Sequence, residues 1–126
     1  MNVLVIPEDF RKDQYILKPI IEAMLIAVGK PRSKVVVCKD PRLGGISQSL
    51  NKERIGEIIN RYKGMVNLFL LCVDRDGVEG RQTRLRELEF KANDLLSEDR
   101  CFLAEYSGDT IPISSIPRVF GGHNTS

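Results

Sequence analysis

The stretch LFLLCV at residues 68–73 runs directly into DRDG at residues 74–77. An apolar run of this length, stopped by turn-forming residues, predicts a β-strand that is buried on both faces. Strands of this kind lie in the middle of parallel sheets, and their carboxyl ends open onto the crevice in which α/β proteins place their chemistry. The stretch therefore predicts an α/β fold with Asp74 and Asp76 at the edge that carries function.

The rest of the chain alternates between strand and helix patterns. Apolar runs predict strands at residues 2–6, 33–38, 66–73 and 101–105. Apolar residues three and four positions apart predict helices at about residues 16–28, 51–63 and 81–96. The order β-α-β-α-β-α-β predicts a four-stranded, mostly parallel sheet with helices on both faces, which is a Rossmann-like three-layer sandwich.

Each of these helices has an apolar stripe that we expect to face the core. The stripe of the second helix comprises Ile55, Ile58, Ile59 and Tyr62. Pro19 interrupts the first helix, so the helix either kinks there or begins there, and Gly29 with Pro31 predicts its end. The stripe of the first helix comprises Ile16, Leu17, Ile20, Ile21, Met24, Leu25 and Val28, and that of the third comprises Leu85, Leu88, Ala92 and Leu95.

The chain divides into one domain and a tail. Its 126 residues are close to the usual size of a single domain, which we place at residues 1–106. Residues 107–126 contain two prolines, three glycines and four serines without helical periodicity. We expect them to form an irregular or disordered tail.

Composition limits the compartment and the partners. The formal net charge of +2 is nearly balanced, so charge alone does not indicate a nucleic-acid-binding protein. The three cysteines, Cys38, Cys72 and Cys101, lie in apolar segments without metal-ligand spacing, which favours a reducing cytoplasm. No signal peptide is visible and no apolar run is long enough to span a membrane, so we expect no membrane partner.

Acidic residues follow two of the predicted strands. The run Val3–Ile6 is stopped by Pro7, and Glu8 comes next, just as Asp74 and Asp76 follow the central strand. In a parallel sheet both strand ends lie on the same edge, so Glu8 is expected near the two aspartates. Neighbouring carboxylates repel, and Mg²⁺ (or Mn²⁺) relieves that repulsion by taking their oxygens as ligands. Three carboxylates of this kind suit metal-assisted phosphoryl transfer or phosphodiester cleavage.

Arginines cluster near the same predicted edge. Arg75, Arg81 and Arg84 surround the start of the third helix, where the helix end already carries partial positive charge. This conflict is typical of a phosphate-binding surface, although an ordinary solvated helix face is the alternative. Arg42 lies in the loop after the second strand and is a further candidate for contact with a sugar-phosphate backbone.

Two other interpretations of the D-x-D-G stretch are excluded, and one stays open. An EF-hand loop needs a third acidic ligand before its glycine, and Gly77 comes too early. An NTPase needs a phosphate-binding loop of the G-x-x-x-x-G-K-[ST] type, which the sequence lacks. A plain turn after a strand also favours aspartate and glycine.

A glutamate after the first strand and D-x-D after the third resemble the Toprim domain of topoisomerases, primases and nucleases of the overcoming-lysogenization-defect type. The resemblance covers about residues 2–106 and rests on Glu8, Asp74 and Asp76. It implies that the aspartates bind Mg²⁺ and that Glu8 donates or accepts a proton. The chain departs from the family at Asp9, where glycine is frequent.

Together these features predict a Toprim-like, Mg²⁺-dependent enzyme that acts on DNA or RNA phosphodiesters, most simply a nuclease. Glu8, Asp74 and Asp76 are the expected catalytic and metal-binding residues. Arg42, Arg75, Arg81 and Arg84 are the expected nucleic-acid contacts. The alternatives are a non-catalytic module that binds nucleic acid or protein, and a receiver-like phosphoacceptor domain. A homodimer or a further protein subunit also stays open.

Overall fold

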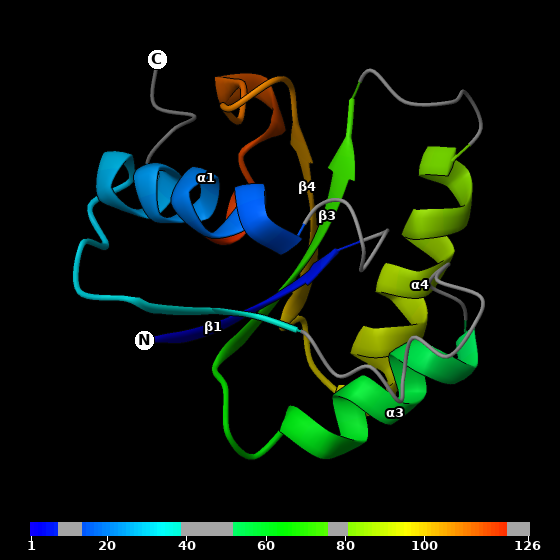
Figure 1. Cartoon of the computed structure of the whole chain (residues 1–126). Coiled ribbons are helices and arrows are strands. Elements are labelled where there is room, and N and C mark those ends of the chain that lie inside the picture. The colour runs from blue at the N-terminus through cyan, green and yellow to red at the C-terminus, as the bar shows by residue number, and fades with distance from the viewer. Residues whose placement is uncertain (8–13, 39–51, 76–80, 121–126) are drawn as a thin grey trace.

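The computed structural model describes residues 1–7, 14–38, 52–75 and 81–120. The strands are β1 (Asn2–Pro7), β2 (Lys34–Val37), β3 (Leu68–Asp74) and β4 (Cys101–Tyr106), as Figure 1 shows. The α-helices of this part of the chain are α1 (Gln14–Ala27), α3 (Lys52–Tyr62) and α4 (Arg81–Leu96). The predicted α/β order is therefore confirmed, and the bounds of α4 coincide with the prediction.

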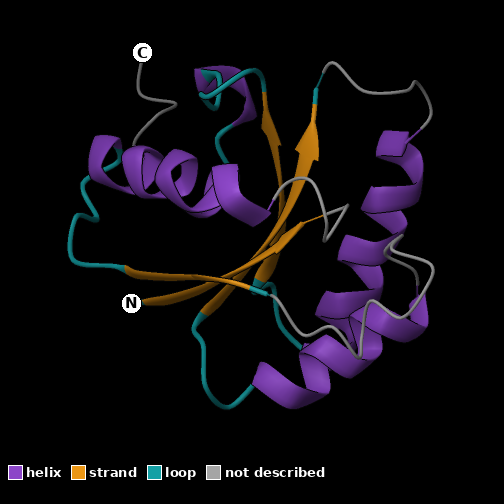
Figure 2. Ribbon diagram, in the orientation of Figure 1, coloured by secondary structure: helices purple, strands orange, loops and turns teal. Residues whose placement is uncertain are grey.

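The four strands form one sheet in the order β2-β1-β3-β4 (Figure 2). Every pair of neighbours is parallel, so the sheet is entirely rather than mostly parallel. The central position of β3 explains its unbroken apolar sequence, because both of its faces are covered.

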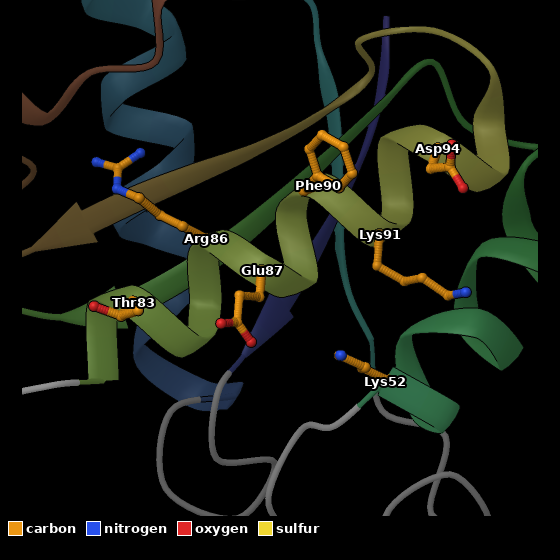
Figure 3. A pocket seen from close by; sticks show the side chains of 7 residues that line it. All are labelled: Lys52, Thr83, Arg86, Glu87, Phe90, Lys91 and Asp94. Atoms are coloured by element: carbon orange, nitrogen blue, oxygen red, sulfur yellow. The ribbon is translucent and has the colours of Figure 1, made fainter.

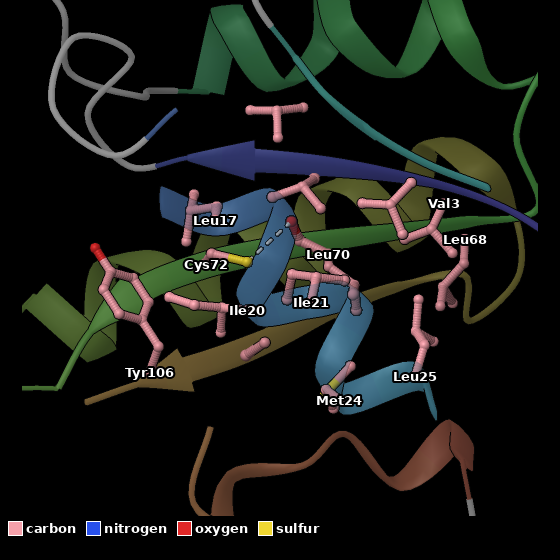
Figure 4. Packing of buried hydrophobic residues seen from close by; sticks show 14 of the residues in the cluster. Val3, Leu17, Ile20, Ile21, Met24, Leu25, Leu68, Leu70, Cys72 and Tyr106 are labelled. Atoms are coloured by element: carbon pink, nitrogen blue, oxygen red, sulfur yellow. Dashed lines mark hydrogen bonds between the residues drawn. The ribbon is translucent and has the colours of Figure 1, made fainter. Parts of the chain in front are cut away.

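Side chains that alternate along the strands build a separate core on each face of the sheet. On one face, α3 and α4 pack against the strands through a cluster around Phe69, Ile58 and Leu88. On the other face, α1 packs against Val3, Leu70 and Cys72 (Figure 4). Helices on both faces complete a three-layer, Rossmann-like sandwich, as predicted.

Two residues of the predicted apolar stripes do not lie in the core. Ile16 is 43% exposed near the start of α1, and Leu95 is 37% exposed near the end of α4. Both lie near a helix end and at the margin of their stripe, so their side chains stay partly open to solvent. The rest of the first stripe is buried, with Val28 partly so, as are Leu85, Leu88 and Ala92.

Helix α1 passes through Pro19 and ends where the sequence predicts. Pro19 lies inside the helix, which begins before it at Gln14, so the alternative of a start at Pro19 is wrong. Gly29 has a φ of 84° and follows the last turn, and Lys30 donates its backbone N–H to the Leu25 carbonyl at 2.7 Å. Glycine is suited to this left-handed position at a helix end.

The predicted tail is irregular but packed as far as Phe120. It contains two short 3-10 helices, η1 (Ile113–Ser115) and η2 (Arg118–Phe120). Phe120 is buried in the same cluster as Leu17 and Ile21 of α1. The packed unit therefore extends past the predicted boundary at residue 106, and residues 121–126 lie outside the description.

Polar side chains join the amino-terminal edge of the sheet to the turns around it. The Nη2 of Arg100 donates to the carbonyl of Lys63 at 2.9 Å and also to the carbonyl of Val66. Its Nε donates to the carbonyl of Asn67 at 3.2 Å. Its guanidinium also lies 5.8 Å from the centre of the Phe69 ring. These bonds fix the turn before β3 against the start of β4.

The outer edge of β4 is bonded to side chains of α4. Asn93 accepts from the backbone N–H of Cys101 at 2.7 Å and donates to its carbonyl at 2.8 Å. Glu89 accepts from the N–H of Leu103 at 2.6 Å. The helix thus satisfies backbone groups of β4, which is the last strand in the order of the described sheet.

No helix in the described segments combines the length and the apolar character needed to cross a membrane.

Candidate functional site at the carboxyl edge of the sheet

The ends of β1 and β3 form a topological switch point. The two strands are neighbours, but β1 leads to α1 on one face and β3 leads to α4 on the other. Chains that leave neighbouring parallel strands toward opposite faces open a crevice between them, and ligands of open α/β sheets bind in that crevice. The fold therefore provides one favoured place for a site, at the carboxyl ends of β1 and β3.

The strand register places the acidic segments beside this crevice. Pro7 at the end of β1 pairs with Cys72, and Asp74 at the end of β3 pairs with Tyr106 of β4. Glu8 is the residue after Pro7, and Asp76 comes two residues after Asp74. Neighbouring strands are about 4.8 Å apart, so both acidic segments leave the sheet close together. Glu8 and Asp76 themselves lie outside the described residues, and the convergence of the three carboxylates stays a prediction.

Asp74 and Arg75 point to opposite faces of the sheet end. Alternation along β3 places Asp74 on the same face as Cys72, which is the α1 face, and directs Arg75 to the α4 face. Asp74 is half-buried and Arg75 is exposed. The backbone N–H of Arg75 donates to the Tyr106 carbonyl at 2.8 Å, which continues the ladder between β3 and β4 past the last residue of β3.

Tyr106 is a site neighbour that the sequence did not reveal. Its side chain is buried at the end of β4, on the α1 face and in register with Asp74 (Figure 4). The only sign of this role in the sequence is that Tyr106 is the last apolar residue of the strand pattern at the end of β4.

The arginines predicted to bind phosphate are only partly described. Arg81 is the first residue of α4, and Arg84 lies exposed in the same first turn, which contains no acidic residue. Figure 1 shows that α4 begins at the same end of the molecule as the tip of β3. The helix start therefore adds partial positive charge at this end of the molecule. Arg42 and the side chain of Arg81 lie outside the description.

The described residues alone do not assemble a metal site. Among them, no group of three or more histidine, cysteine, aspartate or glutamate side chains is placed to hold a metal ion. Asp74 is the one predicted ligand in the described part of the chain. A half-buried carboxylate at a strand end fits the oxygen ligands that Mg²⁺ prefers.

The cysteines do not offer a nucleophile at this edge. Cys38 follows β2, and burial raises the pKa of its thiol to about 11, an effect that Arg61 partly offsets. Burial also raises the pKa of Cys101, and Glu89 and Cys72 raise it further. All three thiols are free and buried, so they act as small apolar side chains.

A hollow of about 530 Å³ lies elsewhere, on the outer side of α4 (Figure 3). It contains both signs of charge and an exposed phenylalanine, and none of its residues follows a strand end. The hollow therefore does not belong to the predicted site. Its lining consists of Lys52, Thr83, Arg86, Glu87, Phe90, Lys91 and Asp94.

Comparisons with protein-family models, with curated proteins and with solved structures found no match to the chain. The fold and the geometry of the strand ends are therefore the observations that bear on function.

Proposed function

We propose that the carboxyl edge of the sheet binds Mg²⁺ or Mn²⁺ and acts on phosphodiester bonds of DNA or RNA, as a Toprim-like nuclease. The adjacency of the β1 and β3 ends at the switch point is the observation that supports this function most directly. It supports the proposal because Glu8 directly follows Pro7, the last residue of β1, in the sequence, and Asp76 comes shortly after Asp74, the last residue of β3.

Asp74 and Asp76 hold the metal, and Glu8 is either a third ligand or the general acid/base. A bound divalent ion would stabilise the charge that develops on the phosphodiester and orient a water molecule. The chain itself contributes the fixed position of Asp74 at the end of a buried strand. Arg75 and the first turn of α4 contribute positive charge that attracts the nucleic-acid backbone.

The receiver-like alternative is less well supported by the end of β4. A phosphoacceptor domain needs a lysine after a late strand, and here β4 ends at Tyr106 and is followed by Ser107.

A matched pair of variants tests the metal site. Asp74→Asn/Asp76→Asn should lose Mn²⁺ binding in calorimetry and should lose cleavage of labelled DNA and RNA in Mg²⁺. Asp99→Asn is the control, because Asp99 is an exposed carboxylate in the turn before β4, at the opposite edge. Equal Mn²⁺ binding by the double variant and the parent would show that the metal site is assigned wrongly.

The arginines are tested by the salt dependence of nucleic-acid binding, with Ca²⁺ in place of Mg²⁺. Each phosphate contact adds about one unit to the slope of log affinity against log salt, so Arg81→Ala/Arg84→Ala should lower the slope by about two. Lys30→Ala/Arg32→Ala is the matched control, because both residues are exposed in the turn before β2, at the opposite edge. An unchanged slope in Arg81→Ala/Arg84→Ala would place the contact surface elsewhere.

A further inference from the structure

Helix α1 is apolar on the side that faces away from the sheet. Eight residues between Tyr15 and Ala27 are exposed, and six of these are apolar. Tyr15 is 75% exposed and Ile26 is 62% exposed. A surface helix normally presents charged and polar residues to water, and one that is apolar all round is normally covered. The exposed apolar residues, which we call the α1 outer face, are Tyr15, Ile16, Pro19, Ala23, Ile26 and Ala27.

The α1 outer face is not used by the fold as described. The opposite side of the helix fills the core through Leu17, Ile21 and Leu25, and η2 joins that same buried cluster through Phe120. The exposed residues therefore contribute no burial to the described fold, and their contact with water is an unfavourable term that a partner would remove.

We propose that the α1 outer face binds the α1 outer face of a second copy of the chain, with the two helices antiparallel. A two-fold axis at the helix midpoint brings residue Tyr15 of each copy to Ile26 of the other, because both lie the same distance from that midpoint. At a rise of about 1.5 Å per residue, the two apolar contacts are about 16 Å apart along the helix. Pro19 and Ala23 lie near the axis, where short side chains let the helices approach.

The charges on α1 match a second copy better than another partner. Lys18 and Glu22 are the exposed charged residues between Tyr15 and Ala27, and they lie on either side of the same midpoint. In the antiparallel pair, Lys18 of each copy lies beside Glu22 of the other, so opposite charges meet twice. Two-fold interfaces are self-complementary in this way. A helix that binds anionic lipid or nucleic acid carries more cations than anions. Here the one cation, Lys18, is balanced by the one anion, Glu22.

The test is the mass of the full chain measured by sedimentation equilibrium over a wide range of concentrations. The parent should approach twice the 14.2 kDa of the single chain. Ile26→Asp should weaken association by at least about 100-fold, since the substitution enters a two-fold interface twice. Phe90→Asp is the matched control, because Phe90 is 76% exposed but lies on α4, on the other face of the sheet. This variant should associate like the parent.

The charges give an independent readout. Lys18→Glu should weaken association by about tenfold, because glutamates then face each other across the axis. Lys18→Glu/Glu22→Lys should restore it, since opposite charges meet again. Thermal unfolding of each variant establishes that it is folded, which is expected because every substituted residue is exposed.

Four outcomes overturn the proposal. In the first, the parent stays monomeric, and in the second, Phe90→Asp dissociates the dimer while Ile26→Asp does not. In the third, the charge swap Lys18→Glu/Glu22→Lys fails to restore association. In the fourth, monomers bind phosphatidylserine vesicles and Ile26→Asp abolishes this binding. The last outcome would assign the α1 outer face to a lipid surface. None of these measurements involves Asp74, Asp76 or nucleic acid, so they test the dimer independently of the proposed function.

Discussion

The two edges of the sheet use polar residues in different ways. At the amino-terminal edge, Arg100 and Asn93 give their side chains to backbone groups of the neighbouring turns and strands. At the carboxyl edge, Arg75 contributes a backbone N–H to the ladder, while its side chain is exposed. The amino-terminal edge is thus tied together by side chains, whereas the carboxyl edge presents charged side chains where strands end.

A polar residue at a strand end can therefore play either of two roles in a parallel sheet. One that bonds to buried backbone groups contributes to the stability of the fold, and its loss leaves those groups without partners. One at the carboxyl end lies where α/β proteins bind their ligands, so its loss is expected to affect binding more than folding. Stability measurements can therefore separate the two edges.

The largest loss of stability is expected for Arg100→Ala. The variant leaves the carbonyls of Lys63, Val66 and Asn67 without their charged donor and removes the contact with the Phe69 ring. Charged hydrogen bonds of this kind contribute about 1.5–3 kcal/mol, so the free energy of unfolding should fall by about 3 kcal/mol. Urea denaturation measures this, with Arg32→Ala as a control that should stay near the parent. A loss as small as that of Arg32→Ala would remove the contrast between the edges.

A smaller effect is expected from Cys38, the buried thiol at the carboxyl end of β2. Its pKa of about 11 in the folded protein is above the ordinary value of 9.0, because burial disfavours the thiolate. The unfolded chain loses this proton first, so the contribution is present below pH 9 and is lost as the pH rises to 11. By pH 11 the loss should reach about 2 kcal/mol.

Cys38→Ala isolates this contribution. The difference in unfolding free energy between parent and variant should change between neutral and alkaline pH, as measured by urea denaturation at several pH values. A constant difference across the range would show that burial at the carboxyl edge does not suppress ionisation of Cys38.

The smallest effect on stability is expected for Asp74→Asn/Asp76→Asn without metal. The substitutions remove two negative charges that lie close in the sequence, so the free energy of unfolding should stay within about 0.5 kcal/mol of the parent or rise. Added Mn²⁺ should then raise the melting temperature of the parent and leave the variant unchanged. A loss as large as that of Arg100→Ala would assign Asp74 and Asp76 to the fold instead of to a site.

The sequence predicts the elements of this fold well because their signals are local. The run at residues 68–73 marks a central strand by itself, and the spacing of Leu85, Leu88 and Ala92 marks a core-facing helix. Ile16 and Leu95 follow the same spacing but are exposed, since coverage at a helix end depends on the neighbouring elements. Nothing near Arg100 in the sequence reveals that its partners lie more than thirty positions earlier.

The candidate site is predictable only in part for the same reason. That acidic segments follow two strands is a local feature, and the rule for parallel sheets places both at one edge. The adjacency of β1 and β3 depends on the strand order, which the sequence pattern leaves open. Tyr106 and Phe120 take their roles from packing against α1, which no local pattern indicates.

The strand order also governs when the chain can fold during its synthesis on the ribosome. β1 lies between β2 and β3, and Asn2 is bonded to Asn67, 65 positions later. β1 therefore leaves the ribosome well before one of its two neighbours exists. The four described strands pair only in parallel, and sheets built from such distant pairings form slowly. The nascent chain must leave one side of β1 unpaired until β3 emerges, which prolongs the exposure of an apolar strand to chaperones.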